Sequence, residues 1–347
     1  MFKYVINNLK NSGHIIKVTI NTKDILEELL IADGIDHENI LPVRRKINTK
    51  ISAFFTLMKK TIALYKVQKR DKYDILVGTE SALSHVGWIF RKPVIIMDED
   101  DLHIIPEVGL VSFPFANYIV SPDSCDLGKW SKKKISYPGY QKLAYLHPNF
   151  FKPDKAPIKD IVDNEERFFL IRVSELSAYH DTSTQGFSVE FLIDLVEKLK
   201  PFGKVIISTE KKLPESLAKY CHLLDITKIH HFLYYADILI ADSQSMCVEA
   251  AVLGTPSLRY SNFAGKIGVL EELEHKFELT FGYSVNHKSE LLNKLNELLN
   301  INDIKEVWQQ KRFKLLEEKI DVTAFWSWLL DKFPYSVHIW KEQKIKF

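Results

Sequence analysis

The sequence predicts an α/β protein of two domains, each with a parallel β-sheet covered by helices. Three observations support this. The chain has 347 residues, more than a single domain usually holds. Short apolar runs alternate with helical patterns along both halves, an order typical of parallel strands joined by right-handed crossovers. A charged, proline-containing stretch at residues 147–167 separates the halves.

We expect residues 1–150 to form the first domain and residues 151–167 to link it to a second domain at 168–320. The last residues, 321–347, are expected to form a helix and a tail that can pack back on the first domain. Apolar runs predict strands at 15–20, 74–78, 93–97, 118–120, 168–173, 204–208 and 238–241. Helical periodicity predicts helices at 2–9, 22–31, 187–200, 214–220, 232–236, 289–299, 304–320 and 323–332, and one that ends near residue 90.

The chain opens on an amphipathic helix, with Phe2, Val5, Ile6 and Leu9 on one side. A doubly wound domain normally opens on its central strand instead, and the loop after that strand lies at the ligand site. We therefore expect that a first strand and its loop are missing here. A genuine helical start is the alternative.

Composition and charge exclude several classes of protein. The formal net charge is +2, so the molecule as a whole is not a polyanion binder. The three cysteines are unclustered, which indicates neither a disulfide framework nor a zinc site and fits a reducing cytoplasm. No apolar run has the length of a membrane span, and Met1 leads into a lysine-bearing segment unlike a signal peptide. We expect a cytoplasmic protein.

Residues 41–72 combine many lysines and arginines with aromatic and aliphatic side chains. A helix of this kind at residues 44–72 can lie against an anionic membrane surface or hold an anionic acceptor. It can also be an ordinary helix that turns its apolar side to the core and its basic side to solvent. Nucleic acid is disfavoured, because no known binding motif accompanies the charge.

The most informative stretch is residues 238–256, which reads as a buried strand, a polar turn and a helix. Asp242 and Ser243 are N-cap residue types, and Gly254 followed by Pro256 ends the helix. A helix start at the end of a parallel strand presents free N–H groups to anions such as phosphate. We expect Ser243, Gln244 and Ser245 to hold a phosphate and Glu249 to meet sugar hydroxyls. An ordinary βα unit is the alternative.

Other residues of the second half lie near the carboxyl ends of strands, where open α/β sheets bind ligands. Arg172 and His180 are expected near a diphosphate, and a base is expected against the backbone around Ile229 and His230. Each of them can also have a purely structural role. Phosphate loops of the Walker type and glycine-rich dinucleotide motifs do not occur in the sequence.

Candidate catalytic groups lie in the first half. Glu80 and His85 follow the expected strand at 74–78, and Asp98 opens an acidic loop at 98–101. Such a loop can hold a divalent metal, but nothing else in the sequence resembles a metal site. We expect neither metal nor cofactor, with the nucleotide-sugar acting as substrate.

Several motifs resemble known families. The segments ADSQSM (241–246), EAA (249–251) and LGTP (253–256) resemble the C-terminal motif of GT-B glycosyltransferases, such as the peptidoglycan lipid II synthase, and of non-hydrolysing UDP-N-acetylglucosamine 2-epimerases. Most of the chain resembles the family called domain of unknown function 354. The matching pieces are GYQKLAYLHP (139–148), AYHD (178–181), the segment at 241–246 and DVTAF (321–325).

The resemblance implies a GT-B-like fold, with two Rossmann-like domains facing across a cleft. It implies a metal-independent glycosyltransferase that uses a UDP-sugar and a cell-surface glycan or lipid-linked acceptor in polysaccharide biosynthesis. A sugar-nucleotide 2-epimerase and a non-catalytic nucleotide-sugar-binding protein are the alternatives. Members of the family usually open on a strand and a histidine-rich loop, both of which this sequence lacks.

Overall fold

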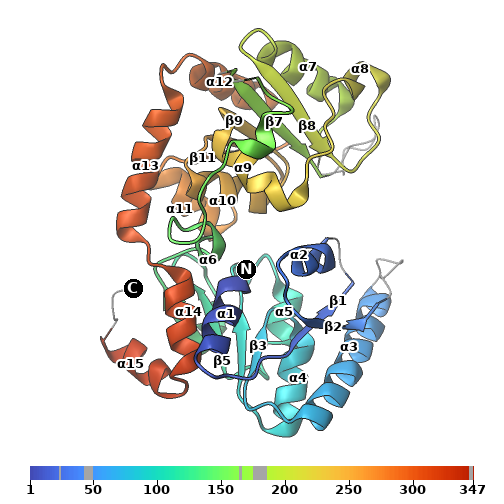
Figure 1. The fold of residues 1–347 in the computed structure, drawn as a ribbon, viewed down its shortest axis with the longest axis vertical. Helices are drawn as coiled ribbons and strands as arrows, with labels where there is room; N and C mark the ends of the chain where they lie inside the picture. Colours follow the sequence, from blue (N-terminus) through green and yellow to red (C-terminus); the bar gives the residue numbers. More distant parts are fainter. Residues whose placement is uncertain (23–24, 43–49, 164–165, 175–185, 344–346) are drawn as a thin grey trace. The chain divides into compact units, whose positions relative to one another are not determined.

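The computed structural model describes residues 1–22, 25–42, 50–163, 166–174, 186–343 and 347 (Figure 1). The chain divides into two compact units, which we call unit 1 (residues 1–145 and 320–347) and unit 2 (residues 146–319). Each contains a parallel β-sheet, as the sequence predicts. Residues 151–167, which we expected to link the domains, fall inside unit 2.

The sheet of unit 2 has five parallel strands in the order β11-β10-β9-β7-β8. Chain order therefore reverses between β7 and β9, which lie side by side at the centre. In its middle the sheet is apolar on both faces: β9 is buried along its whole length. The strands are β7 (Phe168–Val173), β8 (Lys204–Thr209), β9 (Ile238–Ala241), β10 (Ser257–Tyr260) and β11 (Thr280–Tyr283).

The helices of unit 2 bury apolar stripes against this sheet. In α7, for example, Ser188 accepts a hydrogen bond from the Phe191 N–H at 3.1 Å, and Leu195 and Leu199 continue the buried side at a spacing of four residues. The helices are η2 (Ala156–Ile158), α7 (Val189–Leu199), α8 (Glu215–Ala218), η3 (Ile226–Lys228), α9 (Ile229–Tyr235), α10 (Gln244–Leu253), α11 (Gly268–His275), α12 (Lys288–Leu299) and α13 (Ile304–Glu318).

Unit 1 has a four-stranded parallel sheet in the order β3-β4-β5-β6. The parallel pair β1-β2 forms a separate small sheet, and no strand in the described residues joins the two. The strands are β1 (Val18–Asn21), β2 (His37–Leu41), β3 (Leu76–Gly78), β4 (Val94–Met97), β5 (Tyr118–Pro122) and β6 (Lys134–Tyr137). The helices are α1 (Lys3–Asn11), α2 (Leu26–Ala32), α3 (Lys50–Asp71), α4 (Ser81–Phe90), α5 (Pro106–Val111), η1 (Gly128–Lys133), α6 (Leu143–Leu146), α14 (Val322–Asp331) and α15 (Tyr335–Gln343).

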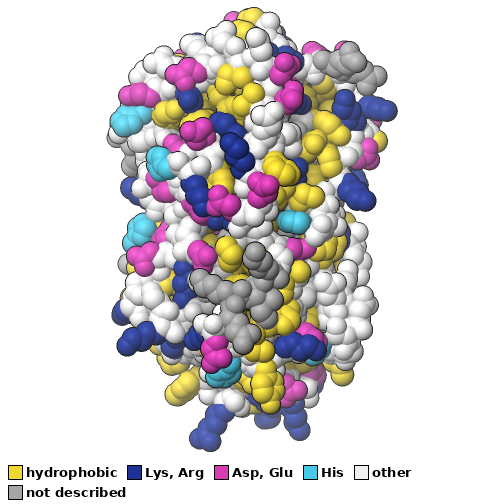
Figure 2. Space-filling view, turned by 90° about the vertical axis from the view of Figure 1, so that its left-hand side faces the viewer, with side chains coloured by type: hydrophobic (Ala, Val, Ile, Leu, Met, Phe, Trp, Pro, Cys, Tyr) yellow, Lys and Arg dark blue, Asp and Glu magenta, His cyan; other side chains and the backbone are white. Residues whose placement is uncertain are grey.

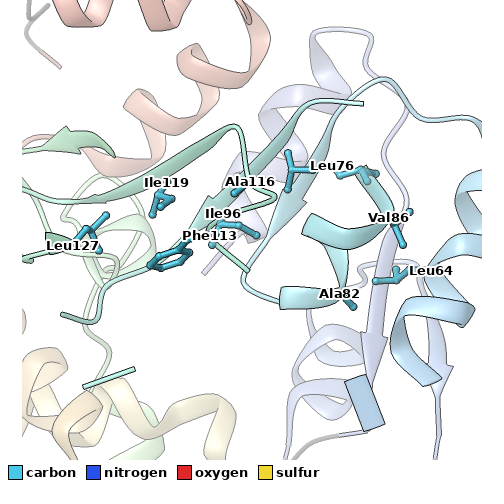
Figure 3. Packing of buried hydrophobic residues seen from close by; sticks show 10 residues of the cluster. Leu64, Leu76, Ala82, Val86, Ile96, Phe113, Ala116, Ile119 and Leu127 are labelled. Carbon is cyan, nitrogen blue, oxygen red and sulfur yellow. The ribbon is translucent and has the colours of Figure 1, made fainter. Parts of the chain in front are cut away.

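A hydrophobic cluster fills the space between the sheet of unit 1 and its helices (Figure 3). Leu64 of α3 and Val86 of α4 meet there, and Ile96 of β4 and Phe113 belong to the same cluster. The C-terminal segment belongs to unit 1 as well. α14 packs against α1, and Thr323 donates a buried hydrogen bond of 2.6 Å to the carbonyl of Ala144.

On the face that Figure 2 shows, acidic and basic side chains are interspersed. Among the helices of the described residues, none is long and apolar enough to cross a membrane.

Candidate functional site

The ends of β7 and β9 form the point in unit 2 where chain order reverses. Ligands of open α/β sheets bind at such points, beyond the carboxyl ends of the strands. Here the two ends are tied together, because both carboxylate oxygens of Asp242 accept the N–H of Ser174, at 2.9 and 3.1 Å. Asp242 is only 8% exposed. The sequence places a polar turn here, and the structure gives its aspartate this cross-strand role.

Helix α10 begins at this point with its N-terminus at the end of β9. Ser243 is the N-cap, and its Oγ accepts the N–H of Met246 at 3.4 Å. The N–H groups of Gln244 and Ser245 belong to the first turn, so the helix itself offers them no carbonyl. The Gln244 side chain donates to Ser261 Oγ at 3.0 Å, which ties the start of α10 to the end of β10. Ser245 is exposed. This helix start has the features of an anion site.

A carboxylate and an imidazole lie one turn further along. Glu249 follows Ser245 by four residues, so the two share a face of α10. His230 of α9 places its Nε2 3.6 Å from Glu249 Oε1, and both side chains are mostly buried. Ile229, the first residue of α9, is half-buried. The structure thus brings together most of the residues that the sequence predicts for a nucleotide-sugar.

The adjacent His231 has a different environment. Its Nδ1 accepts the N–H of Asp154 at 3.0 Å, and its ring packs against Phe151, 5.1 Å between centroids. Burial lowers the pKa of His231, which favours the neutral ring in this contact. His231 therefore fastens α9 to the start of unit 2, whereas His230 faces Glu249.

Arg172 lies at the end of β7 on the side of β8. Its Nη1 donates to Ser208 Oγ at 3.1 Å, and its Nη2 donates to Glu210 Oε1 at 2.9 Å. The Arg172 side chain is 20% exposed and that of Glu210 is 76% exposed. The guanidinium is thus fixed, with a solvated carboxylate as partner. His180, the other expected neighbour of a diphosphate, lies outside the described residues.

The three candidate catalytic residues belong to unit 1. Glu80 binds Lys60 with both carboxylate oxygens, at 2.8 and 2.9 Å. The Nε2 of His85 lies 2.7 Å from the carbonyl of Val111, so both its position and its proton are fixed by a backbone acceptor. Burial raises the pKa of Asp98 to about 7. A pKa near 7 suits a general base at neutral pH.

Two other carboxylates of the acidic loop have structural partners. Glu99 pairs with Lys142 at 2.6 Å and accepts the N–H of Gln141. Asp101 accepts the N–H of Asp126 at 2.6 Å. Within the described ranges, no three histidine, cysteine, aspartate or glutamate side chains lie together as a metal site would require.

A buried arginine in unit 2 was not foreseen from the sequence. Arg259 lies in β10 with 0% exposure, and its Nη2 is 3.9 Å from Glu271 of α11. Burial lowers the pKa of Arg259, and the close approach of Gly282 leaves room for its guanidinium. Burial raises the pKa of the Cys247 thiol of α10 to about 12, although the nearby Arg259 acts in the opposite direction. A single arginine in a short strand gave no local indication of this burial.

Comparison with known proteins supports the fold. A putative UDP-N-acetylglucosamine 2-epimerase from Listeria monocytogenes has a TM-score of 0.63 at 15% identity, covering 94% of this chain and 90% of that one. S. aureus MnaA, solved with UDP, has a TM-score of 0.66 at 13% identity, and the match covers 100% of this chain and 95% of that one. The glycotransferase of kitacinnamycin has a TM-score of 0.60 at 11% identity, and the match covers 95% of this chain and 94% of that one.

No protein-family model and no curated protein matches the sequence, so membership of domain of unknown function 354 stays a prediction. Identities of 11 to 15% among these three structures show the fold alone. The chain has the GT-B-like fold, an α/β architecture with a Rossmann-like parallel sheet in each unit.

Proposed function

We propose that this protein is a metal-independent glycosyltransferase of the GT-B type. It transfers a sugar from a nucleotide-sugar, with UDP as the preferred nucleotide, to a cell-surface glycan or a lipid-linked acceptor. The observation that carries the proposal is the set of groups at the switch point of unit 2. There the N-terminus of α10, Glu249 and His230 adjoin the tied ends of β7 and β9.

The start of α10 supplies the charge stabilisation that such a reaction needs. The leaving diphosphate gains negative charge as the glycosidic bond breaks. Fixed N–H donors at Gln244 and Ser245, with the helix dipole behind them, stabilise this charge without reorganising. Arg172 adds a cation at the end of the neighbouring strand, already oriented by Ser208.

Glu249 and His230 fit the recognition of the nucleoside. A carboxylate accepts hydrogen bonds from both ribose hydroxyls, and a mostly buried one is well positioned to do so. His230 of α9 lies beside that carboxylate, with its Nε2 3.6 Å from Glu249 Oε1. The backbone around Ile229 lies at the start of the same helix, where N–H groups can meet the edge of a base.

Asp98 is our candidate for the base that removes the proton of the acceptor hydroxyl. A pKa of about 7 allows it to be ionised in part at neutral pH and still take up a proton effectively. Glu80 is less suitable because Lys60 binds both of its oxygens. His85 stays a second candidate, through the Nδ1 atom that lies 3.4 Å from Thr61 Oγ1.

Nucleotide-induced thermal stabilisation tests the donor site. UDP should raise the melting temperature more than GDP, CMP or TDP, since binding to the folded state alone stabilises it. Glu249→Ala should abolish this shift. Glu297→Ala is the matched control, because Glu297 is an exposed carboxylate of α12 that pairs with Lys294 on the surface. If none of the four nucleotides stabilises the protein, the proposed donor site is wrong.

A sugar-nucleotide 2-epimerase is the second candidate, favoured by the solved structures of that name with this fold. It would need carboxylates and a histidine close to C2 of the sugar. Incubation with UDP-N-acetylglucosamine separates the two activities. An epimerase forms a second hexosamine without an acceptor, whereas a transferase needs one. Binding of UDP with neither product would indicate a non-catalytic nucleotide-sugar-binding protein.

A further inference from the structure

Helix α3 of unit 1 is apolar on two sides. Its inner side carries Leu64 and Val67, which are buried, and Leu57, which packs on the core. Figure 3 shows Leu64 directed toward Val86 and Ala82 of α4. This inner side explains how α3 is held to the unit. Helices that are apolar all round are normally covered all round.

The outer side of α3 is instead open to solvent. It consists of six large apolar side chains, which we call the outer stripe. Their spacing of i, i+3, i+4, i+7, i+11 and i+14 keeps them on one face of a helix. They are Ile51 (71% exposed), Phe54 (59%), Phe55 (55%), Met58 (44%), Ile62 (53%) and Tyr65 (37%).

The apolar surface continues on the neighbouring helices. α3 packs against α4, and His85 of α4 links Thr61 of α3 to the backbone of Val111 at the end of α5. Ile89, one turn after His85, is 49% exposed, and Leu110 of α5 is 64% exposed. Large exposed apolar side chains thus occur on three neighbouring helices of unit 1.

Lysines border the outer stripe. α3 carries six cationic residues and one carboxylate. Two of these cations have acidic partners, since Lys60 binds Glu80 and Arg70 binds Asp71. The exposed Lys59, Lys66 and Lys69 have no carboxylate partner in the part of the chain that the structure describes. Lys59 and Lys66 lie along one flank of the stripe, as their spacing of seven residues requires.

We propose that α3 is an interfacial membrane-binding helix, whose outer stripe enters the headgroup region of an anionic bilayer while its lysines meet the lipid phosphates. Aromatic and aliphatic side chains on one face with lysines at its border are the features of such helices. A second copy of this chain fits less well. A two-fold contact would place the stripe against itself and bring the lysines of both copies together.

This inference gives the proposed transferase a way to reach a lipid-linked acceptor, and to that extent it rests on the proposed function. The two can fail separately, because vesicle binding is measured without nucleotide and nucleotide binding without vesicles. Membrane docking would place the protein at the inner face of the membrane as a peripheral protein.

Vesicle sedimentation with the full chain tests the proposal. Vesicles of phosphatidylcholine with phosphatidylglycerol should bind the protein at about 0.05 M salt and much less at about 0.5 M, because salt screens the lysines. Vesicles of phosphatidylcholine alone should bind it more weakly. No sedimentation with anionic vesicles at low salt would overturn the proposal.

Paired variants separate the two parts of the surface. Phe54→Gln with Phe55→Gln should lower the partition coefficient at least about tenfold. Lys59→Gln with Lys66→Gln should lower the partition coefficient roughly 30-fold, and only with anionic vesicles. The matched control is Phe313→Gln with Lys314→Gln, because these neighbours on α13 are also exposed. It should leave binding unchanged.

Two further measurements test whether misfolding or self-association, rather than membrane contact, explains the vesicle results. Thermal unfolding should be the same for all variants, since every replaced side chain is exposed. Sedimentation velocity tests self-association. If the phenylalanine pair changes the mass of the particle in solution and the wild type ignores vesicles, a second copy covers the stripe and the membrane proposal is wrong.

Discussion

Replacing Asp242 by alanine should destabilise unit 2 by about 2–3 kcal/mol. The side chain is 8% exposed, and both its oxygens accept the Ser174 N–H, at 2.9 and 3.1 Å. A hydrogen bond to a charged group contributes about 1.5–3 kcal/mol, and the variant also leaves the Ser174 N–H without its acceptor. The loop after β7 would lose its tie to the turn after β9, although the strands themselves stay paired, so UDP should bind more weakly as well.

Urea unfolding followed by circular dichroism measures this loss of stability. It is obtained from the shift in the midpoint urea concentration, provided that the slope of the unfolding free energy against urea concentration is unchanged. Two compact units can unfold in separate steps, so the curves are fitted with two transitions. Asp242→Asn keeps one acceptor oxygen and should lose about half as much. Asp194→Ala is the control, because it breaks only an exposed pair with Lys288 and should cost less than about 1 kcal/mol. Equal costs for the two alanine variants would refute the reasoning.

Three other predictions follow from burial and backbone geometry. The pKa of Asp98 is raised to about 7 in the folded state, so the protonated carboxyl contributes stability that is fully present below about pH 4 and is lost as pH rises through 7. Asp98→Asn should therefore remove this pH dependence of the free energy of unfolding. Near pH 8, urea unfolding should show the variant to be more stable by up to about 4 kcal/mol. Gly254→Ala should cost more than Gly265→Ala, by about 1–2 kcal/mol. Both glycines have positive φ, but a Cβ at Gly254 would lie 2.5 Å from a glutamine side chain, whereas at Gly265 it would meet nothing; equal melting temperatures would contradict this. Iodoacetamide should modify Cys221 before Cys247 in the native protein, because burial raises the pKa of Cys247 to about 12, and peptide mass spectrometry reads the order.

The centre of unit 2 could be predicted from the sequence in detail. Strands β7 and β9 begin and end at the residues expected, 168–173 and 238–241. Both are buried on the two faces of the sheet, so nearly every side chain is apolar and the run itself marks the strand. The helix start at Gln244 was equally clear from the N-cap residues before it.

Strands β10 and β11 could not be predicted, because their polar side chains find partners only in the folded sheet. Ser257 bonds to Thr280 at 2.8 Å across the two strands. Arg259 is buried against α11 and beside Gly282. No strand was expected at either segment. Their pairing depends on contacts between residues more than twenty positions apart.

The same limit applies to the candidate site. The sequence indicates that Asp242 or Ser243 caps α10, but Ser243 does so, and Asp242 binds Ser174, which is distant in sequence and adjacent only through the pairing of β7 with β9. Arg172 likewise finds Ser208 through the pairing of β7 with β8. Residue type suggested the candidate residues, and strand order decided their partners.

Helix α3 shows what periodicity can and cannot decide. From the sequence, α3 could be a core-facing helix or a membrane-facing one, because its apolar residues fall on two different faces of the helix. The structure uses one set for the core, in which Leu64 is buried, and leaves the other set exposed. Phe54 and Phe55 are more than half exposed, so their burial adds little to the stability of the folded unit. Folding of unit 1 explains Leu64, and the proposed membrane contact would explain the exposed Phe54 and Phe55.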